Sequence, residues 1–220
     1  MNPSERIAQE IPLELAPRKD IEKIVAVLTS AFFSYPGIKF MTSIARDGKK
    51  AVRDYFYFWM EEAYINRAVF RASEKYEGVL VFCLVGYPKT NIWIRGKTLW
   101  ANLNQFKISD IKKVYTHEGD LDRAHHRVMG DRPHYYLELL GVDPKLQGKK
   151  IASRLVNPVL AYADRIGNPC YLETSSAQNT KVYGSWGFKV VETIPTPFIK
   201  NKTVYLMVRK PASNTSLYKE

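Results

Sequence analysis

Residues 134–152 read HYYLELLGVDPKLQGKKIA, and no other segment of the chain says as much about its architecture. The run from Tyr135 to Leu140 is apolar, as expected of a buried strand, and it ends at Gly141-Val142-Asp143-Pro144. A polar loop follows at residues 147–152, and a long amphipathic helix comes after it. A phosphate held at this loop would meet backbone N–H groups, the positive end of a helix and two lysines. The segment therefore predicts a site for a phosphate-bearing cofactor.

The helix after the loop and the elements that follow it complete a strand–helix–strand crossover. The helix stops at Gly167-Asn168-Pro169, and Pro158 inside it predicts either a kink or a tolerance supplied by tertiary packing. Residues 170–174 are predicted as a strand and residues 178–186 as a short helix. Two more strands are expected at 188–191 and 203–208. The apolar face of the long helix carries Ile151, Leu155, Val159, Ala163 and Ile166.

The chain before this unit alternates between helical and strand periodicity. Asp20 is a suitable N-cap for a helix with an apolar face, and a second amphipathic helix is expected at about 49–65. Residues 69–72 and 78–85 look like two antiparallel strands. Residues 91–129 return to helices. The pattern predicts a single α/β domain over residues 1–220.

Composition and charge limit the classes of protein. No run of about 18 apolar residues exists, and the first residues lack the apolar stretch of a signal peptide, so no membrane partner and a cytoplasmic home are expected. Cys83 and Cys170 lie in apolar runs and are expected to be reduced core thiols. The net charge of +11 is spread along the chain. It fits a polyanionic cofactor better than nucleic acid, because basic and aromatic residues are not interleaved on one strand.

Four pieces in order resemble the GCN5-related N-acetyltransferase (GNAT) superfamily, and within it puromycin acetyltransferase-like members. They are the segments 139–144, 147–152 and 171–175, and the set Asn179, Tyr183 and Gly187-Phe188. The resemblance covers residues 134–209, which would form the cofactor-binding core, and the helices at 20–130 would build the acceptor pocket. It implies an α/β (α+β) fold with a central, mostly antiparallel mixed sheet, helices on both faces and a splayed parallel strand pair.

The resemblance also implies acetyl-coenzyme A as the co-substrate and no metal. Its pyrophosphate would lie on the amides of the loop, and its pantetheine would run along the strand before the loop. Lys150 departs from the pattern, because the family has glycine there; a positive φ would cost a lysine roughly 1 kcal/mol more than a glycine. The implied cofactor-binding residues are Leu140, Gly141, Val142, Gln147, Gly148, Lys149, Lys150, Ile151, Ala152 and Asn179.

Direct acetyl transfer to an amine needs a base for the ammonium, donors for the developing oxyanion and a proton for the departing thiolate. Tyr183 is the expected acid, with a core aromatic packed on Trp186 and Phe188 as the alternative, and the Val142 amide is the family-implied oxyanion donor. Glu138 is the first choice for a base acting through water, against a structural ion pair, and Glu173 is the second. His134 is expected either at the amine-binding mouth or as a surface or capping residue.

The acceptor is expected to be a small-molecule or peptide amine, handled by a monomer or a homodimer. Aromatic residues of the early helices, among them Tyr35, Trp93 and Trp100, would line an acceptor pocket or belong to the core. Two other functions remain open at this point. The first is a non-catalytic acyl-coenzyme A sensor, which Lys150 would permit, and the second is a basic nucleic-acid-binding module.

Overall fold

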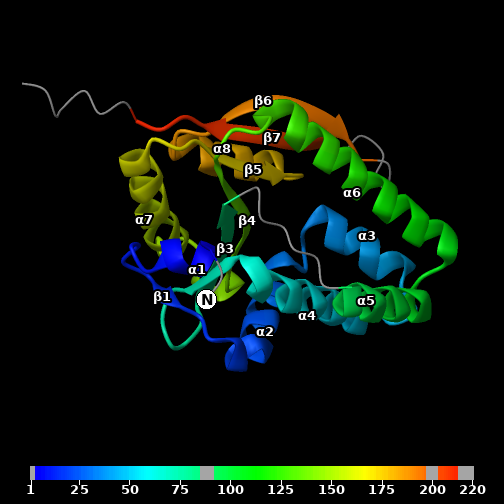
Figure 1. Ribbon diagram of the computed structural model, residues 1–220. Helices are drawn as coiled ribbons and strands as arrows, with labels where there is room; N and C mark the ends of the chain where they lie inside the picture. The colour runs from blue at the N-terminus through cyan, green and yellow to red at the C-terminus, as the bar shows by residue number, and fades with distance from the viewer. Residues whose placement is uncertain (1–2, 85–91, 197–202, 213–220) are drawn as a thin grey trace, which may run out of the picture.

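The computed structural model describes residues 3–84, 92–196 and 203–212. Its strands form a single sheet, and its helices lie around that sheet (Figure 1). In chain order they are α1 (Pro3–Ala8), β1 (Glu14–Leu15), the 3-10 turn η1 (Arg18–Asp20), α2 (Ile21–Phe32), α3 (Pro36–Ile44), α4 (Gly48–Asn66), β2 (Ala68–Arg71), β3 (Gly78–Leu84), α5 (Ile92–Gln105), α6 (Ile108–Met129), β4 (Tyr135–Val142), η2 (Pro144–Leu146), α7 (Ile151–Ile166), β5 (Cys170–Thr174), α8 (Ala177–Ser185), β6 (Lys189–Pro195) and β7 (Thr203–Arg209).

The sheet has seven strands in the order β1-β2-β3-β4-β5-β7-β6. Every neighbouring pair is antiparallel except β4 and β5, which are parallel. That parallel pairing covers only two positions, Tyr135 opposite Cys170 and Tyr136 opposite Tyr171. Beyond them the two strands no longer pair, although β4 continues to Val142 and β5 to Thr174. The expected mixed sheet with a splayed parallel pair is therefore confirmed.

Helices cover both faces of the sheet, and Figure 1 shows α1 and α7 on the side opposite to α4 and α6. The α7 side is filled by four of the five residues predicted for the apolar face of that helix, from Ile151 to Ala163, packed on the sheet. The prediction is wrong for Ile166, which is 46% exposed at the last turn of α7. On the other side, α2 and α4 cover the first half of the sheet, and α6 covers the second half, around Tyr171 and Leu206. The two faces account for the apolar character of β3 on both sides, as in a central strand.

Two glycines let helices approach the strands that carry the site. A Cβ at Gly78 would lie 2.9 Å from Ile151 Cγ2, and a Cβ at Gly141 would lie 2.9 Å from Leu28 Cδ2. Both distances are shorter than real Cβ contacts, so larger residues there would push α7 and α2 away from the sheet. The first contact fixes the beginning of α7, which is the end that carries the phosphate loop.

A β-bulge in β4 changes which residues share a face. Val81 pairs with Leu139 and Phe82 pairs with Leu137, so Glu138 is an extra residue with no partner on β3. The simple alternation of a strand would place Glu138 on one face with Tyr136 and Leu140. That expectation is wrong for Leu140, which packs on the α7 side, whereas Glu138 contacts Cys83 on the opposite side.

The other elements agree with the sequence patterns in most places. Pro36 does more than end α2: it occupies the first turn of α3, a helix that the sequence did not predict, where its fixed φ suits a helix start. Asp20 precedes α2 but makes no capping bond; its carboxylate instead accepts a 2.8 Å hydrogen bond from Tyr76. The helix α7 runs through Pro158 without a break. Residue 85, the expected end of β3, lies outside the described residues.

Both cysteines are free, as expected. In the described part of the chain, no single helix has the length and apolarity to cross a membrane, and one bent pair, residues 18–32 with 36–44, meets the criterion only when taken together.

Candidate active site

The splay between β4 and β5 leaves main-chain groups of β4 facing a gap. The Asp143 amide donates to Glu77 O, 2.9 Å away, so it points toward β3. Successive amides along a strand point to opposite edges. The amides of Val142 and Leu140 therefore point away from β3, into the gap beside β5. An extended ligand lying there can form backbone hydrogen bonds as an added strand would.

The loop at the end of β4 presents a group of amides to one point. Gly148 and Lys150 both have positive φ, 80° and 60°, and Lys150 precedes the first residue of α7. Among the described residues, the amides of Gly148, Lys150, Ile151 and Ala152 have no hydrogen-bond acceptor. Successive free N–H groups at a helix N-terminus form a concave site for an anion.

Lysine side chains add positive charge to this loop. Lys149 and Lys150 are exposed, and Lys150 adopts the left-handed conformation, with a φ of 60° and a ψ of 17°, so the condition under which lysine costs more than glycine is met. Gln147 and Gly148 are also exposed, whereas Ile151 is buried against the sheet. All predicted loop residues thus lie at one end of the splay, with the backbone of residues 140–142 leading into it.

Tyr183 lies on α8, the helix that follows β5. Its ring packs against Trp186 and Phe188, with centroids 5.8 and 6.2 Å apart, so the core contacts considered for it are real. Its hydroxyl has no hydrogen-bond partner among the described residues, and burial, together with Tyr35, raises its pKa. On the same helix, the backbone N–H of Asn179 donates a hydrogen bond to Ser176 Oγ, and this bond caps the N-terminus of α8.

Tyr35 is a residue of this region that the sequence did not single out for chemistry. Its hydroxyl accepts a 2.6 Å hydrogen bond from the Ser175 amide and lies 3.2 Å from Thr174 Oγ1, at the free end of β5. It joins the α2–α3 connection to β5. The sequence indicated it only as one of the aromatic residues of an acceptor pocket or the core, because no local pattern predicts a contact 140 residues away.

Glu173 lies on β5, next to the gap. Burial raises the pKa of its carboxyl, and the nearby Asp122 raises it further, while a 2.6 Å hydrogen bond from the Tyr171 hydroxyl acts in the opposite direction. A carboxylate with a raised pKa and a hydrogen bond that orients it suits a general base.

Glu138 lies across the gap from Glu173, but it is already paired. Arg67 Nε lies 2.5 Å from one carboxylate oxygen, and Cys83 Sγ donates to the other at 3.2 Å. Both charged side chains are largely buried. The ion pair expected as one alternative for Glu138 is therefore present, and its role as a base remains a prediction. The clue to Arg67 was the carboxylate itself, because a buried carboxylate in an apolar strand requires a partner.

Further carboxylates gather around these two in a protein of net charge +11. Glu118 of α6 has its pKa raised to about 7, first by burial and then by Asp122 and Glu62. Asp122 also acts on Glu173, and Glu138 acts on Tyr55 and Tyr136. Acidic groups from α4, α6, β4 and β5 thus share one region on the α6 side of the splay. Their combined potential favours a cation there.

Two histidines, His125 and His134, pack next to the same region and contact Tyr171. His134 is buried, so neither a position at the mouth nor one at the surface is correct. Its Nδ1 lies 2.7 Å from the Arg132 carbonyl and must donate, so its Nε2 accepts from His125 Nε2, also at 2.7 Å. The His125 ring stacks on Tyr171 at 4.0 Å, and burial lowers the pKa of His125 to about 4. The pair is neutral and holds the tyrosine that orients Glu173.

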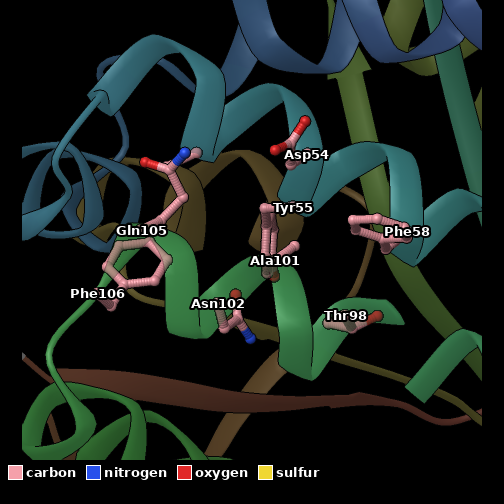
Figure 2. Close-up of a pocket in the computed structure, with 9 residues that line it drawn as sticks. Asp54, Tyr55, Phe58, Thr98, Ala101, Asn102, Gln105 and Phe106 are labelled. Atoms are coloured by element: carbon pink, nitrogen blue, oxygen red, sulfur yellow. The ribbon is translucent and has the colours of Figure 1, made fainter. Parts of the chain in front are cut away.

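The aromatic residues expected to line a pocket divide into two groups. Tyr35 lies at the site, whereas Trp93 and Trp100 are 79% and 72% exposed on α5, so the alternative that they belong to the core is wrong. A recess lies between α4 and α5, where Tyr55 and Phe58 face Thr98 and Ala101 (Figure 2). Its volume of about 20 Å³ holds about one water molecule, so it is no substrate site. No group of three metal-binding side chains occurs within the described ranges.

Comparison with known proteins agrees with this geometry. Residues 114–188 match the family model of the acetyltransferase (GNAT) family. An uncharacterized N-acetyltransferase of Schizosaccharomyces pombe, C550.08, is 26% identical over 215 residues, which cover 90% of this chain and 82% of the relative.

Solved structures share the fold. A histone acetyltransferase HPA2 and related acetyltransferase from Corynebacterium glutamicum is 21% identical with a TM-score of 0.57, over 92% of this chain and 97% of that one. Arylalkylamine N-acetyltransferase 2 from Aedes aegypti is 16% identical with a TM-score of 0.61, over 92% and 99%. The splayed strands, the loop of free amides and these similarities agree with one another: the chain has the fold of the solved acetyltransferases, and residues 114–188 match the acetyltransferase (GNAT) family.

Proposed function

We propose that the enzyme transfers an acetyl group from acetyl-coenzyme A directly to a primary amine of a small molecule or peptide. The observation that carries the proposal is the continuity between the free amides at 148–152 and the outward amides of β4. The first group would bind a diphosphate and the second an extended amide chain, and coenzyme A contains both of these parts joined in that order. Bound there, acetyl-coenzyme A supplies the activated acetyl group.

The residues of the chain would share the binding as follows. The amides of Gly148, Lys150, Ile151 and Ala152 would hold the phosphates, with Lys149 nearby as a further cation. The main chain of residues 140–142 would align the extended part of the ligand in the splay. The Val142 amide points into the gap and would donate to the acetyl oxygen as charge develops on it.

Glu173 is the better of the two candidate bases on geometry. Glu138 is held by Arg67 at 2.5 Å, and that ion pair would have to loosen before the carboxylate could accept a proton. Glu173 accepts hydrogen bonds from the hydroxyls of Tyr171 and Tyr136 and has no ion-pair partner among the described residues, and burial raises its pKa. We assign Glu173 the removal of the ammonium proton through water. The surrounding carboxylates would favour a cationic amine over a neutral one.

Tyr183 would provide the proton for the departing thiolate. Support for this role comes from its hydroxyl, which has no partner among the described residues. Its raised pKa keeps the hydroxyl protonated, so that it can donate a hydrogen bond to the departing sulfur. Because the amine attacks directly, the enzyme itself forms no covalent intermediate, and both substrates must be bound together.

The test is thiol release from acetyl-coenzyme A, measured with a panel of amines. Glu173→Gln and Tyr183→Phe should each lower kcat strongly, and Tyr115→Phe, an exposed tyrosine of α6, is the matched control. Thermal stabilisation by coenzyme A reports binding separately. Stabilisation without turnover for any amine would favour the second candidate, a non-catalytic acyl-coenzyme A sensor, for which the left-handed Lys150 in place of glycine is the supporting observation.

A further inference from the structure

Helix α5 packs in the reverse of the usual sense, with its apolar face toward solvent. Its exposed side chains include Ile92 and Trp93, both 79% exposed, and Trp100, 72% exposed. At 100° per residue these three fall, with Leu99 and Leu103, within an arc of roughly 120° of the helix. Scattered exposed apolar residues are ordinary on protein surfaces, but a continuous stripe with two tryptophans is not.

The opposite face of α5 carries small and polar residues, and these contact α4. Thr98, Ala101 and Gln105 point toward Tyr55 and the α4 backbone in Figure 2. Ala101 and Gln105 are buried, so this contact fixes the rotation of the helix. The outward direction of the tryptophans is thus a consequence of how α5 is anchored.

Cations border the apolar stripe on both sides. Arg95 and Lys97 are exposed, and their helical positions lie just beyond the two edges of the arc. Residues 92–109 contain no aspartate or glutamate, although Lys107 adds a third cation at the end of the helix. Glu118 of α6 is close enough to Arg95 for the two charges to interact, but α5 itself carries no acidic residue. A helix with an apolar band that includes tryptophan and is flanked by cations has the composition of one that lies in the interface of a bilayer.

We propose that the outer face of α5 docks on an anionic lipid surface. The tryptophans and aliphatic side chains would enter the boundary between head groups and acyl chains, and Arg95 and Lys97 would contact lipid phosphates. A second copy of the chain fits this face poorly, because facing helices would bring their cations together with no carboxylate between residues 92 and 109 to compensate. The proposal is independent of the acetyl-transfer chemistry and differs from the expectation that the protein has no membrane partner.

The experiment measures binding of the full chain to vesicles of phosphatidylcholine alone and of phosphatidylcholine mixed with phosphatidylserine, by cosedimentation and tryptophan emission. We expect binding to the mixed vesicles, a shift of emission to shorter wavelength and a weaker partition at high salt. Arg95→Gln/Lys97→Gln should weaken the partition by about 30-fold, because each cation near an anionic surface contributes on the order of 1 kcal/mol. Trp93→Ser/Trp100→Ser should weaken it by at least about tenfold.

The matched control is Lys19→Gln/Lys75→Gln, which removes the same charge from exposed positions in η1 and in the β2–β3 connection, far from α5 in Figure 1. Its partition should equal that of the wild type. Equal losses in the control and the Arg95/Lys97 variant would overturn the proposal, since net charge alone would then drive binding. It would also fail if the tryptophan variant bound as tightly as the wild type, or if light scattering showed a dimer through this face and no vesicle binding. Far-UV circular dichroism of each variant establishes that it is folded.

Discussion

Lys150 is the position where a small change should separate backbone strain from ligand binding. Its φ of 60° and ψ of 17° place it in the left-handed region, and its side chain is exposed, so replacement leaves no cavity. A residue with a Cβ pays roughly 1–2 kcal/mol for this conformation, whereas glycine does not. Glycine loses about 0.4–1 kcal/mol through the greater entropy of its unfolded chain. At the middle of these ranges, Lys150→Gly should therefore be more stable than Lys150→Ala by about 0.8 kcal/mol.

The neighbouring lysine supplies the control. Lys149 has no positive φ. There alanine should be more stable than glycine by about 0.4–1 kcal/mol, the opposite sign. The difference between the two comparisons is about 1.5 kcal/mol, which urea unfolding resolves when the m-values agree. If Lys150→Ala proved as stable as Lys150→Gly, the tertiary structure would not be holding residue 150 in a left-handed conformation.

The same four variants report on the cofactor. Both replacements of Lys150 remove its ammonium group, so the KM for acetyl-coenzyme A should rise equally in the two, whatever their stabilities. A rise in Lys150→Ala alone would mean that the strain, and not the charge, controls the phosphate loop.

Three further outcomes follow from buried ionisable groups. Because burial raises the pKa of Glu173 and a base must be deprotonated, kcat/KM should fall as the pH decreases through that raised value. Glu173→Gln should abolish this acidic limb of the pH profile of kcat/KM. If the variant kept the acidic limb, Glu173 would be excluded as the base. Arg67→Met should destabilise the fold by roughly 3–5 kcal/mol, because it leaves Glu138 charged and buried. In urea unfolding, the double variant with Glu138→Leu should recover most of that loss. No recovery would mean that the two side chains are uncoupled. The pKa of His125 is lowered to about 4 in the fold, so the unfolded chain binds a proton more readily. The free energy of unfolding should therefore decrease as the pH falls from about 6.5 toward 4. The dependence of this free energy on pH should be weaker in His125→Asn, and an unchanged dependence would assign it to other groups.

The sequence by itself determined the elements whose cause is local. The apolar periodicity of residues 151–163 predicted α7 and its buried face, and the stop at Gly167-Asn168-Pro169 marked its end. The loop at 147–152 could be identified because free amides at a helix N-terminus follow from the chain order alone. The pattern raised a positive φ at Lys150 only as a condition, and the structure shows that the condition holds.

Only the tertiary structure decided which side chains meet. The bulge at Glu138 arises from the pairing of β4 with β3, and it moved that carboxylate to the face where Arg67 pairs with it. The contact between Tyr35 and Ser175 links residues 140 positions apart, and no local pattern encodes it. The rotation of α5, which turns Trp93 outward, depends on its packing against α4. Periodicity reports that a helix has an apolar face, whereas the neighbours it packs against fix the direction in which that face points.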